Sequence, residues 1–354
     1  MMIKRGAAVV AVGLVGLLSP NVAAAAIKTY SVGADPGRMA RAADGSMWFT
    51  KTGAVGRITT AGAARSFGLP AANAGSVRDV LGITVAPDGS VWAAEAGGSV
   101  ARIDGAGKVS EFAPAVLGMP AGIVVGPDGQ VWFSDALLGR ITRFDLAGGF
   151  VDQVLGNVPG AYSRMDPAAP TEMVLGPDQA VWVLQLAPGR VGRMSGDGSV
   201  SYYGLPAGPA SAPTGLAFGR DGALWIAEAG VNRIARMALD GTVREYAIPS
   251  ARAEPRAIAV GPDGAMWFSE FGRDRIGRVD GAGNVTEYEL PPGSMPYGIV
   301  GGADDAVWVT LWGKGGEVAR VTTDTRIVAR AARAGRRIAK RVHTRRTARA
   351  RKRL

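Results

Sequence analysis

The chain has 354 residues, of which 47% are apolar, 52 are Gly and 21 are Pro, a composition typical of an all-β protein with many turns. It contains no cysteine, which excludes a disulfide framework, a thiolate zinc site and a cysteine nucleophile. The net charge of +10 comes from the ends of the chain. Residues 323–354 hold 13 Lys or Arg and one Asp, whereas residues 27–322 hold 25 basic and 29 acidic side chains and are mildly acidic.

Residues 1–26 have the features of a secretory signal peptide. Two basic residues, Lys4 and Arg5, precede an apolar run over residues 6–18, and small residues follow at 23–26. This order predicts export with cleavage just before Ile27, which would place the mature protein outside the cell or in the cell envelope. The alternative is an uncleaved membrane anchor, although the apolar run is short for a membrane span.

Residues 27–322 are built from one repeated unit, seen most clearly at residues 257–288. There, four short apolar runs (257–260, 265–269, 275–279 and 284–288) are separated by turn residues such as Pro-Asp-Gly, which predicts four antiparallel strands. Seven units of this length predict an all-β, seven-bladed β-propeller of four-stranded antiparallel blades. In each unit a Trp follows an acidic turn residue by four positions, and we expect these large aromatic side chains to pack between blades. The seven are Trp48, Trp92, Trp132, Trp182, Trp225, Trp267 and Trp308, at spacings of 44, 40, 50, 43, 42 and 41 residues.

The first strand of the repeat region is out of place. Residues 27–32 have the pattern of a fourth strand but precede the first complete unit, whereas the last unit, residues 297–322, has only three strands of its own. We therefore predict that the N-terminal strand supplies the outer strand of the last blade and closes the ring.

An insertion interrupts the regular spacing between the third and fourth blades. The connection over residues 156–171 accounts for most of the 50-residue interval, and the next turn reads Asp178-Gln179 where five other copies read Asp-Gly. Meander topology places this connection on the face of the ring where the second strands end. It either carries function or decorates the rim.

The residue three positions after each Trp is expected at that same face. Four of the seven are acidic, and such carboxylates can hold a hard cation through oxygen ligands. Alternatively, each pairs with an Arg of the third strand of its blade, at Arg140 or Arg143, Arg233 or Arg236, and Arg275 or Arg278. The seven residues are Lys51, Glu95, Asp135, Gln185, Glu228, Glu270 and Leu311.

Residues 323–354 form a separate basic tail. Its charge predicts binding to an anionic surface, either membrane lipid or an anionic cell-wall polymer. No motif in the chain supports specific recognition of nucleic acid.

The repeat PxGIxxGPDGxxWFxE, followed by RIGRxxxxGxxxEYxLP, resembles the virginiamycin B lyases over the whole of residues 27–322. The resemblance implies a seven-bladed propeller that opens the lactone of streptogramin B antibiotics, which are cyclic depsipeptides, by a magnesium-dependent elimination. In that family, Glu-Pro-His precedes the first strand of one blade, a second Glu follows the Trp of that blade, and another His lies one blade earlier.

The matching positions of this chain keep the acids and lack the histidines. They read Glu254-Pro255-Arg256, then Glu270, with Thr214 at the position one blade earlier. The resemblance thus marks Glu270, Glu254, Arg256 and Thr214 as catalytic positions and Glu254 and Glu270 as ligands of Mg²⁺. Arg stays protonated and Thr is an unactivated alcohol, so neither replaces His as a general base or acid. The only His in the chain, His343, lies in the basic tail.

These observations predict an exported, monomeric protein with an altered lyase site that binds a small cyclic peptide or another small ligand at the mouth of the propeller. The alternative is a magnesium-dependent carbon–oxygen lyase that opens streptogramin B-type lactones. A metal-dependent, lactonase-like hydrolase is the third function considered.

Overall fold

The structure is a computed structural model, and it describes residues 22–70, 79–113, 118–144, 150–152, 170–313 and 315–323. Most of the predicted signal peptide, nearly all of the insertion at 156–171 and the basic tail beyond residue 323 lie outside these residues. Within them, no helix is long and apolar enough to cross a membrane.

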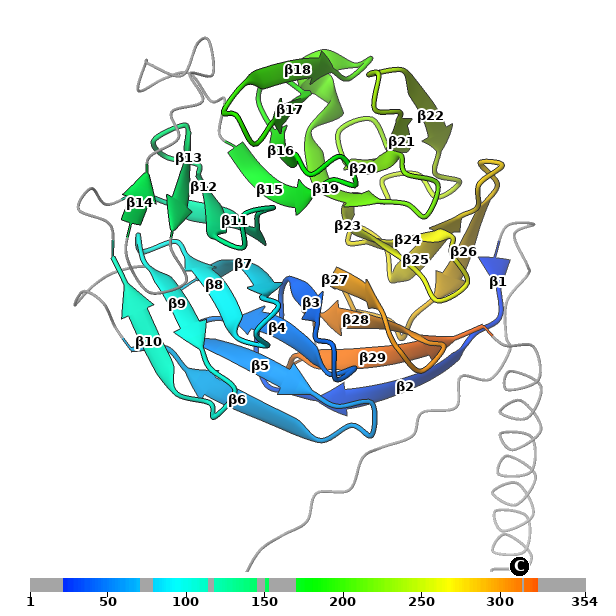
Figure 1. The fold of residues 1–354 in the computed structure, drawn as a ribbon. Helices are drawn as coiled ribbons and strands as arrows, with labels where there is room; N and C mark the ends of the chain where they lie inside the picture. The colour runs from blue at the N-terminus through cyan, green and yellow to red at the C-terminus, as the bar shows by residue number, and fades with distance from the viewer. Residues whose placement is uncertain are drawn as a thin grey trace, which may run out of the picture.

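Seven antiparallel sheets are arranged around a ring, as predicted (Figure 1). The first three blades are β3 (Met39–Arg41), β4 (Met47–Lys51), β5 (Ala54–Ile58) and β6 (Ala64–Gly68); β7 (Val80–Val85), β8 (Val91–Glu95), β9 (Val100–Ile103) and β10 (Val109–Phe112); and β11 (Pro120–Val125), β12 (Val131–Asp135), β13 (Arg140–Phe144) and β14 (Phe150–Asp152). The fourth and fifth are β15 (Pro170–Leu175), β16 (Val181–Gln185), β17 (Arg190–Met194) and β18 (Val200–Gly204), and then β19 (Pro213–Phe218), β20 (Leu224–Glu228), β21 (Arg233–Met237) and β22 (Val243–Ala247). A short 3-10 helix, η1 (Gly208–Ser211), joins these two blades. The sixth blade contains β23 (Pro255–Val260), β24 (Met266–Glu270), β25 (Arg275–Val279) and β26 (Val285–Glu289), and the seventh begins with β27 (Pro296–Gly301), β28 (Val307–Leu311) and β29 (Glu317–Thr322).

The seam of the ring is closed by the N-terminal strand. Strand β2 (Ala26–Ser31) pairs antiparallel with β29 along its whole length and completes the seventh blade, which confirms the prediction. A two-residue strand, β1 (Val22–Ala23), pairs parallel with β26 at the outer edge of the sixth blade. These two residues belong to the segment that the sequence assigns to the signal peptide.

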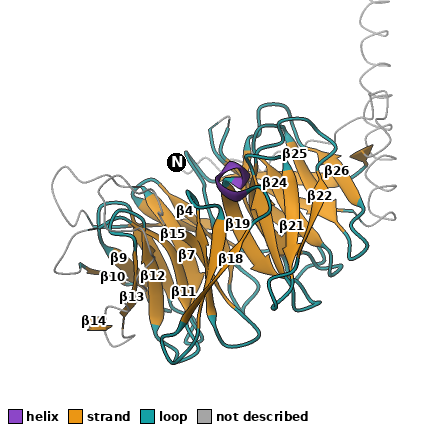
Figure 2. Ribbon diagram, turned by 90° about the horizontal axis from the view of Figure 1, so that it is seen from above, coloured by secondary structure: helices purple, strands orange, loops and turns teal. Residues whose placement is uncertain are grey.

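The strands run across the thickness of the ring, with connections at its two faces (Figure 2). On the turn face, an Asp-containing turn joins the first and second strands of each blade. On the mouth face, the first strand begins beside the end of the second, as in the pairing of Pro255 with Glu270. The first strands line the centre of the ring and the fourth strands lie outermost (Figure 1).

One arrangement of side chains recurs on the turn face. In the sixth blade, Asp263 accepts hydrogen bonds from the Trp267 indole (3.0 Å) and the Ala265 backbone N–H, and it forms an ion pair with Arg278 (2.6 Å) on the neighbouring strand. Hydrogen bonds to the charged form hold the pKa of this carboxyl below its usual value, although burial opposes them. Each of the other six blades has the same Asp–Arg ion pair.

The seven Trp side chains of the repeat are buried, as predicted, at 0–8% exposure. Trp225, for example, stacks on Tyr246 of its own blade (ring centres 5.7 Å apart) and lies in one apolar cluster with Ile258 and Phe268 of the next blade. Such clusters repeat around the ring, so the core is a series of layers between blades.

Candidate functional site

The four family positions lie on the mouth face of the fifth and sixth blades, but their side chains do not converge. The Glu254 side chain is exposed and packs beside Gly272, and its backbone is in the left-handed region (φ 49°). Glu270 is fully buried. The backbone segments meet because Phe271 N–H donates to the carbonyl of Glu254 (3.2 Å).

Glu270 points into the layer between blades, away from solvent. It lies two residues beyond Phe268 on β24, and side chains two residues apart share one face of a strand. That face packs against the fifth blade, with Ile248 and Ala253 in the same cluster. Burial, followed by the charge of Glu287, raises the pKa of Glu270 to about 8, while Arg275 and Arg273 oppose the shift. Neither carboxyl oxygen of Glu270 has a hydrogen-bond partner among the described residues.

The environment of Glu270 is repeated elsewhere in the ring. In the fifth blade, burial raises the pKa of Glu228 to about 8, and the neighbouring Glu245 adds to the shift through its charge and a side-chain hydrogen bond. In the second blade, burial and Glu111 raise the pKa of Glu95 to about 7. A buried Glu facing a fourth-strand Glu is therefore a feature of three blades, and only one of them corresponds to the family site.

The acids that end the second strands were expected to form ion pairs with an Arg of the third strand, and among the described residues one blade has such a pair. Asp135 lies 3.6 Å from Arg140 on β13. In the fifth and sixth blades the arginine pairs with the fourth strand instead. Arg233 pairs with Glu245, and Arg275 pairs with Glu287 (3.1 Å) and Glu289 (3.2 Å).

Thr214 connects two blades through its hydroxyl group. The Oγ1 atom donates to the carbonyl of Pro255 on the next blade (2.6 Å) and lies 3.3 Å from the carbonyl of Ala227. Ser134, Ser269 and Thr310 make equivalent 2.6 Å bonds to the following blade from their second strands. The fifth blade has Ala227 at that strand position, and Thr214 makes the connection from the first strand.

Arg256 lies on an aromatic surface at the mouth. Its Cζ atom is 4.9 Å from the centre of the Phe271 ring and 5.9 Å from that of Tyr297. The Phe271 ring also contacts Trp312 (centres 6.1 Å apart), whose side chain is 44% exposed. The Nε atom of Arg256 is buried and has no hydrogen-bond partner among the described residues.

A second arginine reaches the same surface from the first blade. Arg38 pairs with Glu172 of the fourth blade and donates to the carbonyl of Thr214 (3.1 Å), and its Cζ atom is 5.8 Å from the centre of the Tyr297 ring. Strands β3 and β15, which position these two residues, lie on opposite sides of the ring (Figure 1). The ion pair therefore crosses the centre of the propeller. Burial lowers the pKa of Arg38, Tyr297 opposes this shift, and the positive charge of Arg256 adds to it.

Sequence reasoning missed this ion pair, although the repeat contains a signal for it. Other blades have a small residue directly before the first apolar pair of the first strand, and a Cβ atom on Gly122 would lie 2.0 Å from the carbonyl of Thr171. Arg38 and Glu172 occupy the corresponding positions of their blades. The Arg38 N–H bonds to Thr50 in the first blade, as the Gly298 N–H bonds to Thr310 in the seventh. Glu172 directly precedes Met173 in the fourth blade, as Gly122 precedes Ile123 in the third.

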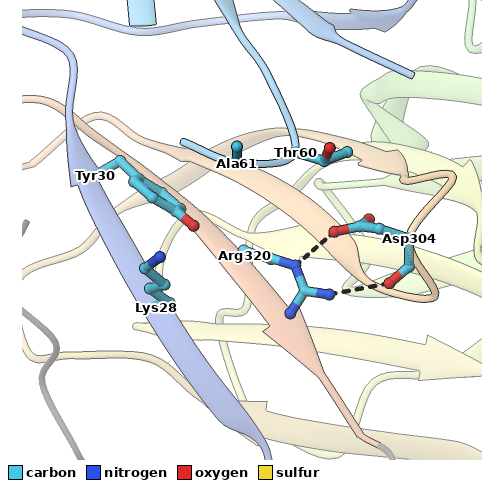
Figure 3. A pocket seen from close by; sticks show the side chains of 6 residues that line it. All are labelled: Lys28, Tyr30, Thr60, Ala61, Asp304 and Arg320. Carbon is cyan, nitrogen blue, oxygen red and sulfur yellow. Dashed lines mark hydrogen bonds and ion pairs between the residues drawn. The ribbon is translucent and has the colours of Figure 1, made fainter. Parts of the chain in front are cut away.

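Two hollows lie away from this surface. One, of about 440 Å³, is at the seam, where Asp304 accepts two bonds from Arg320, and Lys28 lies over the Tyr30 ring (Figure 3). The other, of about 460 Å³, lies on the mouth face of the sixth blade and includes Arg273 and Arg275 in its lining. The charges of the seam hollow are mostly paired with one another, which makes it a poor ligand site.

The described residues fit a magnesium site poorly. In the ranges that the structure describes, no three acidic or His side chains gather into a possible metal site. Of the two expected ligands, Glu254 is exposed and Glu270 is buried in the layer between blades. Magnesium binding by this pair stays a prediction, and no chemical step is derived through the metal.

Comparisons with known proteins agree with the architecture. A model of the virginiamycin B lyase family matches residues 8–208 and 118–334, which together extend over most of the chain. A sequence search of curated proteins finds no match.

Several solved lyase structures are similar to this chain. Virginiamycin B lyase from Staphylococcus aureus is 26% identical, with a TM-score of 0.72 over 84% of this chain and 99% of the lyase. A streptogramin B lyase is 27% identical, with the same TM-score and coverage of 84% and 97%. A catalytically inactive variant of the S. aureus enzyme with quinupristin is 26% identical, with a TM-score of 0.72 and coverage of 84% and 99%. The resemblance seen in the repeat motif is thereby confirmed, and the chain belongs to the virginiamycin B lyase family.

Proposed function

We propose that this protein binds a small ligand at the mouth of the propeller and does not open a lactone ring. The proposal rests mainly on the side chains at the two positions where the family has histidine. The Thr214 hydroxyl donates its hydrogen bond to the carbonyl of Pro255, and the Arg256 guanidinium, a cation, lies over the Phe271 ring. Neither can remove a proton from carbon or return one to a leaving group near neutral pH.

Burial of Glu270 supports the same proposal. An accessible carboxylate with a raised pKa is a good general base, but a base must come within hydrogen-bonding distance of the proton that it removes. Glu270 is 0% exposed and faces the layer between blades. With a pKa of about 8, it is also mostly protonated at neutral pH.

Incubation with virginiamycin B and Mg²⁺ tests the proposal. Retention time and fragmentation in liquid chromatography–mass spectrometry are the readout, because elimination leaves the mass of the ligand unchanged whereas hydrolysis adds water. We expect the lactone to be recovered intact. Magnesium-dependent opening that is lost in Glu270→Ala would contradict the proposal and establish the alternative, a lyase that works without histidine.

A double variant provides the matched positive test. Thr214→His with Arg256→His restores both family side chains and leaves Glu254 and Glu270 in place. Positioned acid–base groups contribute about 10²- to 10⁴-fold in rate, so ring opening should rise from background by a factor in this range. The Arg256→His single variant lacks one of the two groups and should remain close to background.

Export and attachment to the cell envelope are part of the same proposal. The leader at residues 1–26 and the 13 basic residues of the tail support them. A ligand-binding propeller held at an anionic surface by its tail would be released as rising salt screens the charges.

A further inference from the structure

We infer that the mouth selects ligands that carry a free carboxylate beside an apolar or aromatic group, and that Arg256, assisted by Arg38, binds the carboxylate. This inference rests on the proposed function and names its ligand class. It concerns Arg256, which stands where the family has histidine, and Arg38, and it follows from the charge balance and the aromatic surface of the mouth.

The first argument is that Arg256 has no acidic partner. No ion pair joins it to an acid in the part of the chain that the structure describes, and its buried Nε atom has no acceptor there. The two family acids do not neutralise it, because Glu254 is exposed to water and Glu270 is mostly protonated at neutral pH. A half-buried guanidinium without an acceptor favours an incoming anion, since a charge-assisted hydrogen bond recovers the cost of its desolvation.

The second argument is the number of charges around Tyr297. Two guanidiniums lie against this ring, Arg256 at 5.9 Å and Arg38 at 5.8 Å, and one carboxylate, Glu172, pairs with Arg38. The cluster therefore has an excess of one positive charge. A ligand carboxylate balances it, and Glu172 is its built-in competitor for Arg38.

The third argument is the surface next to the charge. Phe271, Tyr297 and Trp312 form a continuous aromatic surface. The centre of the Phe271 ring is 5.9 Å from that of Tyr297 and 6.1 Å from that of Trp312, which is partly exposed. Aromatic faces bind apolar and aromatic groups, and a guanidinium held over one keeps the N–H donors in its own plane free for an oxygen acid. The combination fits an organic acid with an apolar body better than inorganic phosphate.

The inference reverses the preference expected of a lactone-opening enzyme. An intact lactone is a neutral ester at the bond concerned, whereas the opened chain carries a carboxylate there. A mouth with Arg256 and Arg38 is complementary to the opened acid, so this protein would bind the product of ring opening in preference to its substrate.

Isothermal titration of the full protein with two matched probes tests this preference. The probes are virginiamycin B and the hydroxy acid made from it by alkaline hydrolysis of the lactone. One charge-assisted pair corresponds to an affinity ratio of about 10- to 100-fold, and we expect the acid to bind more tightly by that factor. Equal affinities, tighter binding of the lactone, or binding of neither probe would overturn the inference.

Variants assign the effect to the named residues. Arg256→Ala should abolish the preference, Arg256→Lys should keep part of it, and Glu172→Gln should tighten binding of the acid by removing the competitor. Arg273→Ala is the control, because this mouth-face arginine is bonded to the carbonyl of Ala251 and lies outside the aromatic surface. Circular dichroism spectra and melting temperatures establish that each variant is folded.

The two hypotheses fail in different ways. Ring opening of virginiamycin B would contradict the proposed function whatever the affinities. An unchanged acid preference in Arg256→Ala would overturn only the assignment of the carboxylate site, and ligand binding without chemistry would still stand.

Discussion

The two faces of the propeller differ in how strictly they follow the repeat. On the turn face, all seven blades have an Asp that pairs with an Arg of the third strand, and the aromatic ring of the Trp lies beneath. On the mouth face, the residue that ends the second strand is Lys, Glu, Asp, Gln or Leu, depending on the blade. The loop lengths between blades vary there as well.

This difference separates the parts of the repeat that maintain the ring from those that are free to change. A Trp between blades stabilises two sheets at once, so each blade requires a large aromatic side chain at the same position of its second strand. The mouth face has no such requirement, because its loops contact solvent. Arg38 and Glu172 replace the small residue of the repeat on this face, and Arg38 lies with Arg256 beside Tyr297 at the candidate ligand surface.

The largest effect is expected from a matched pair of Trp substitutions, one in the core between blades and one on the mouth face. Trp225→Ala removes a ring that is 2% exposed, its stacking on Tyr246 and its hydrogen bond to Asp221. We expect a loss of about 3 to 5 kcal/mol in the free energy of unfolding, measured by chemical denaturation. Trp312→Ala, on the mouth face, removes a ring that is 44% exposed and should cost much less. Similar losses at the two positions would contradict the division between the faces.

A smaller effect concerns the buried acids and pH. Glu270 has a folded-state pKa of about 8, above the ordinary value of 4.5, so between these pH values the folded state holds a proton that the unfolded state has released. Stability from this group is fully present below about pH 4.5 and is lost as pH rises to about 8, at a slope of up to about 1.4 kcal/mol per pH unit. Glu270→Gln should flatten the decline in melting temperature over this window.

The control for this experiment is in the same ion-pair cluster. Glu289 also pairs with Arg275, but its side chain is 60% exposed. Glu289→Gln should leave the pH profile of the melting temperature unchanged. If both variants flatten the profile equally, the decline belongs to the surface charges of the cluster and not to the buried acid.

Much of the fold was predictable because the repeat reports it directly. The in-phase Trp residues gave the number of blades, and the surplus fourth-strand pattern at residues 27–32 predicted the pairing of β2 with β29 that the structure shows. Both predictions depend on local patterns. The strand β1 was not predicted, because Val22 and Ala23 lie within the small-residue end of a leader and make their contact with β26, far along the chain.

The side-chain directions at the mouth were harder to predict. Glu270 was expected at the mouth because it ends a strand there, but it shares a strand face with Phe268 and therefore turns into the layer between blades. The Arg38–Glu172 pair joins two blades on opposite sides of the ring. No spacing rule connects residues 134 positions apart, so only their departure from Gly in the repeat could have drawn attention to them.

The smallest predicted effect concerns one of the two turns on the turn face that lack Gly after the Asp, at Gln179 in the fourth blade and Asp305 in the seventh. Gln179 takes the left-handed conformation (φ 59°) where Gly222 of the next blade has φ 72°, and the left-handed region strains a residue with a Cβ atom by about 1 to 2 kcal/mol. Gly loses more chain entropy on folding, by about 0.5 to 1 kcal/mol, so Gln179→Gly should stabilise the protein by about 0.5 kcal/mol, seen as a slightly higher denaturation midpoint. The reciprocal Gly222→Gln should lower stability by a similar amount, since no atom lies within 4 Å of a Cβ at Gly222 and backbone strain alone decides the result. If Gln179→Gly were instead destabilising, the Gln179 side chain would have a role in the fourth blade, and the turn face would be less uniform than its seven Asp–Arg pairs suggest.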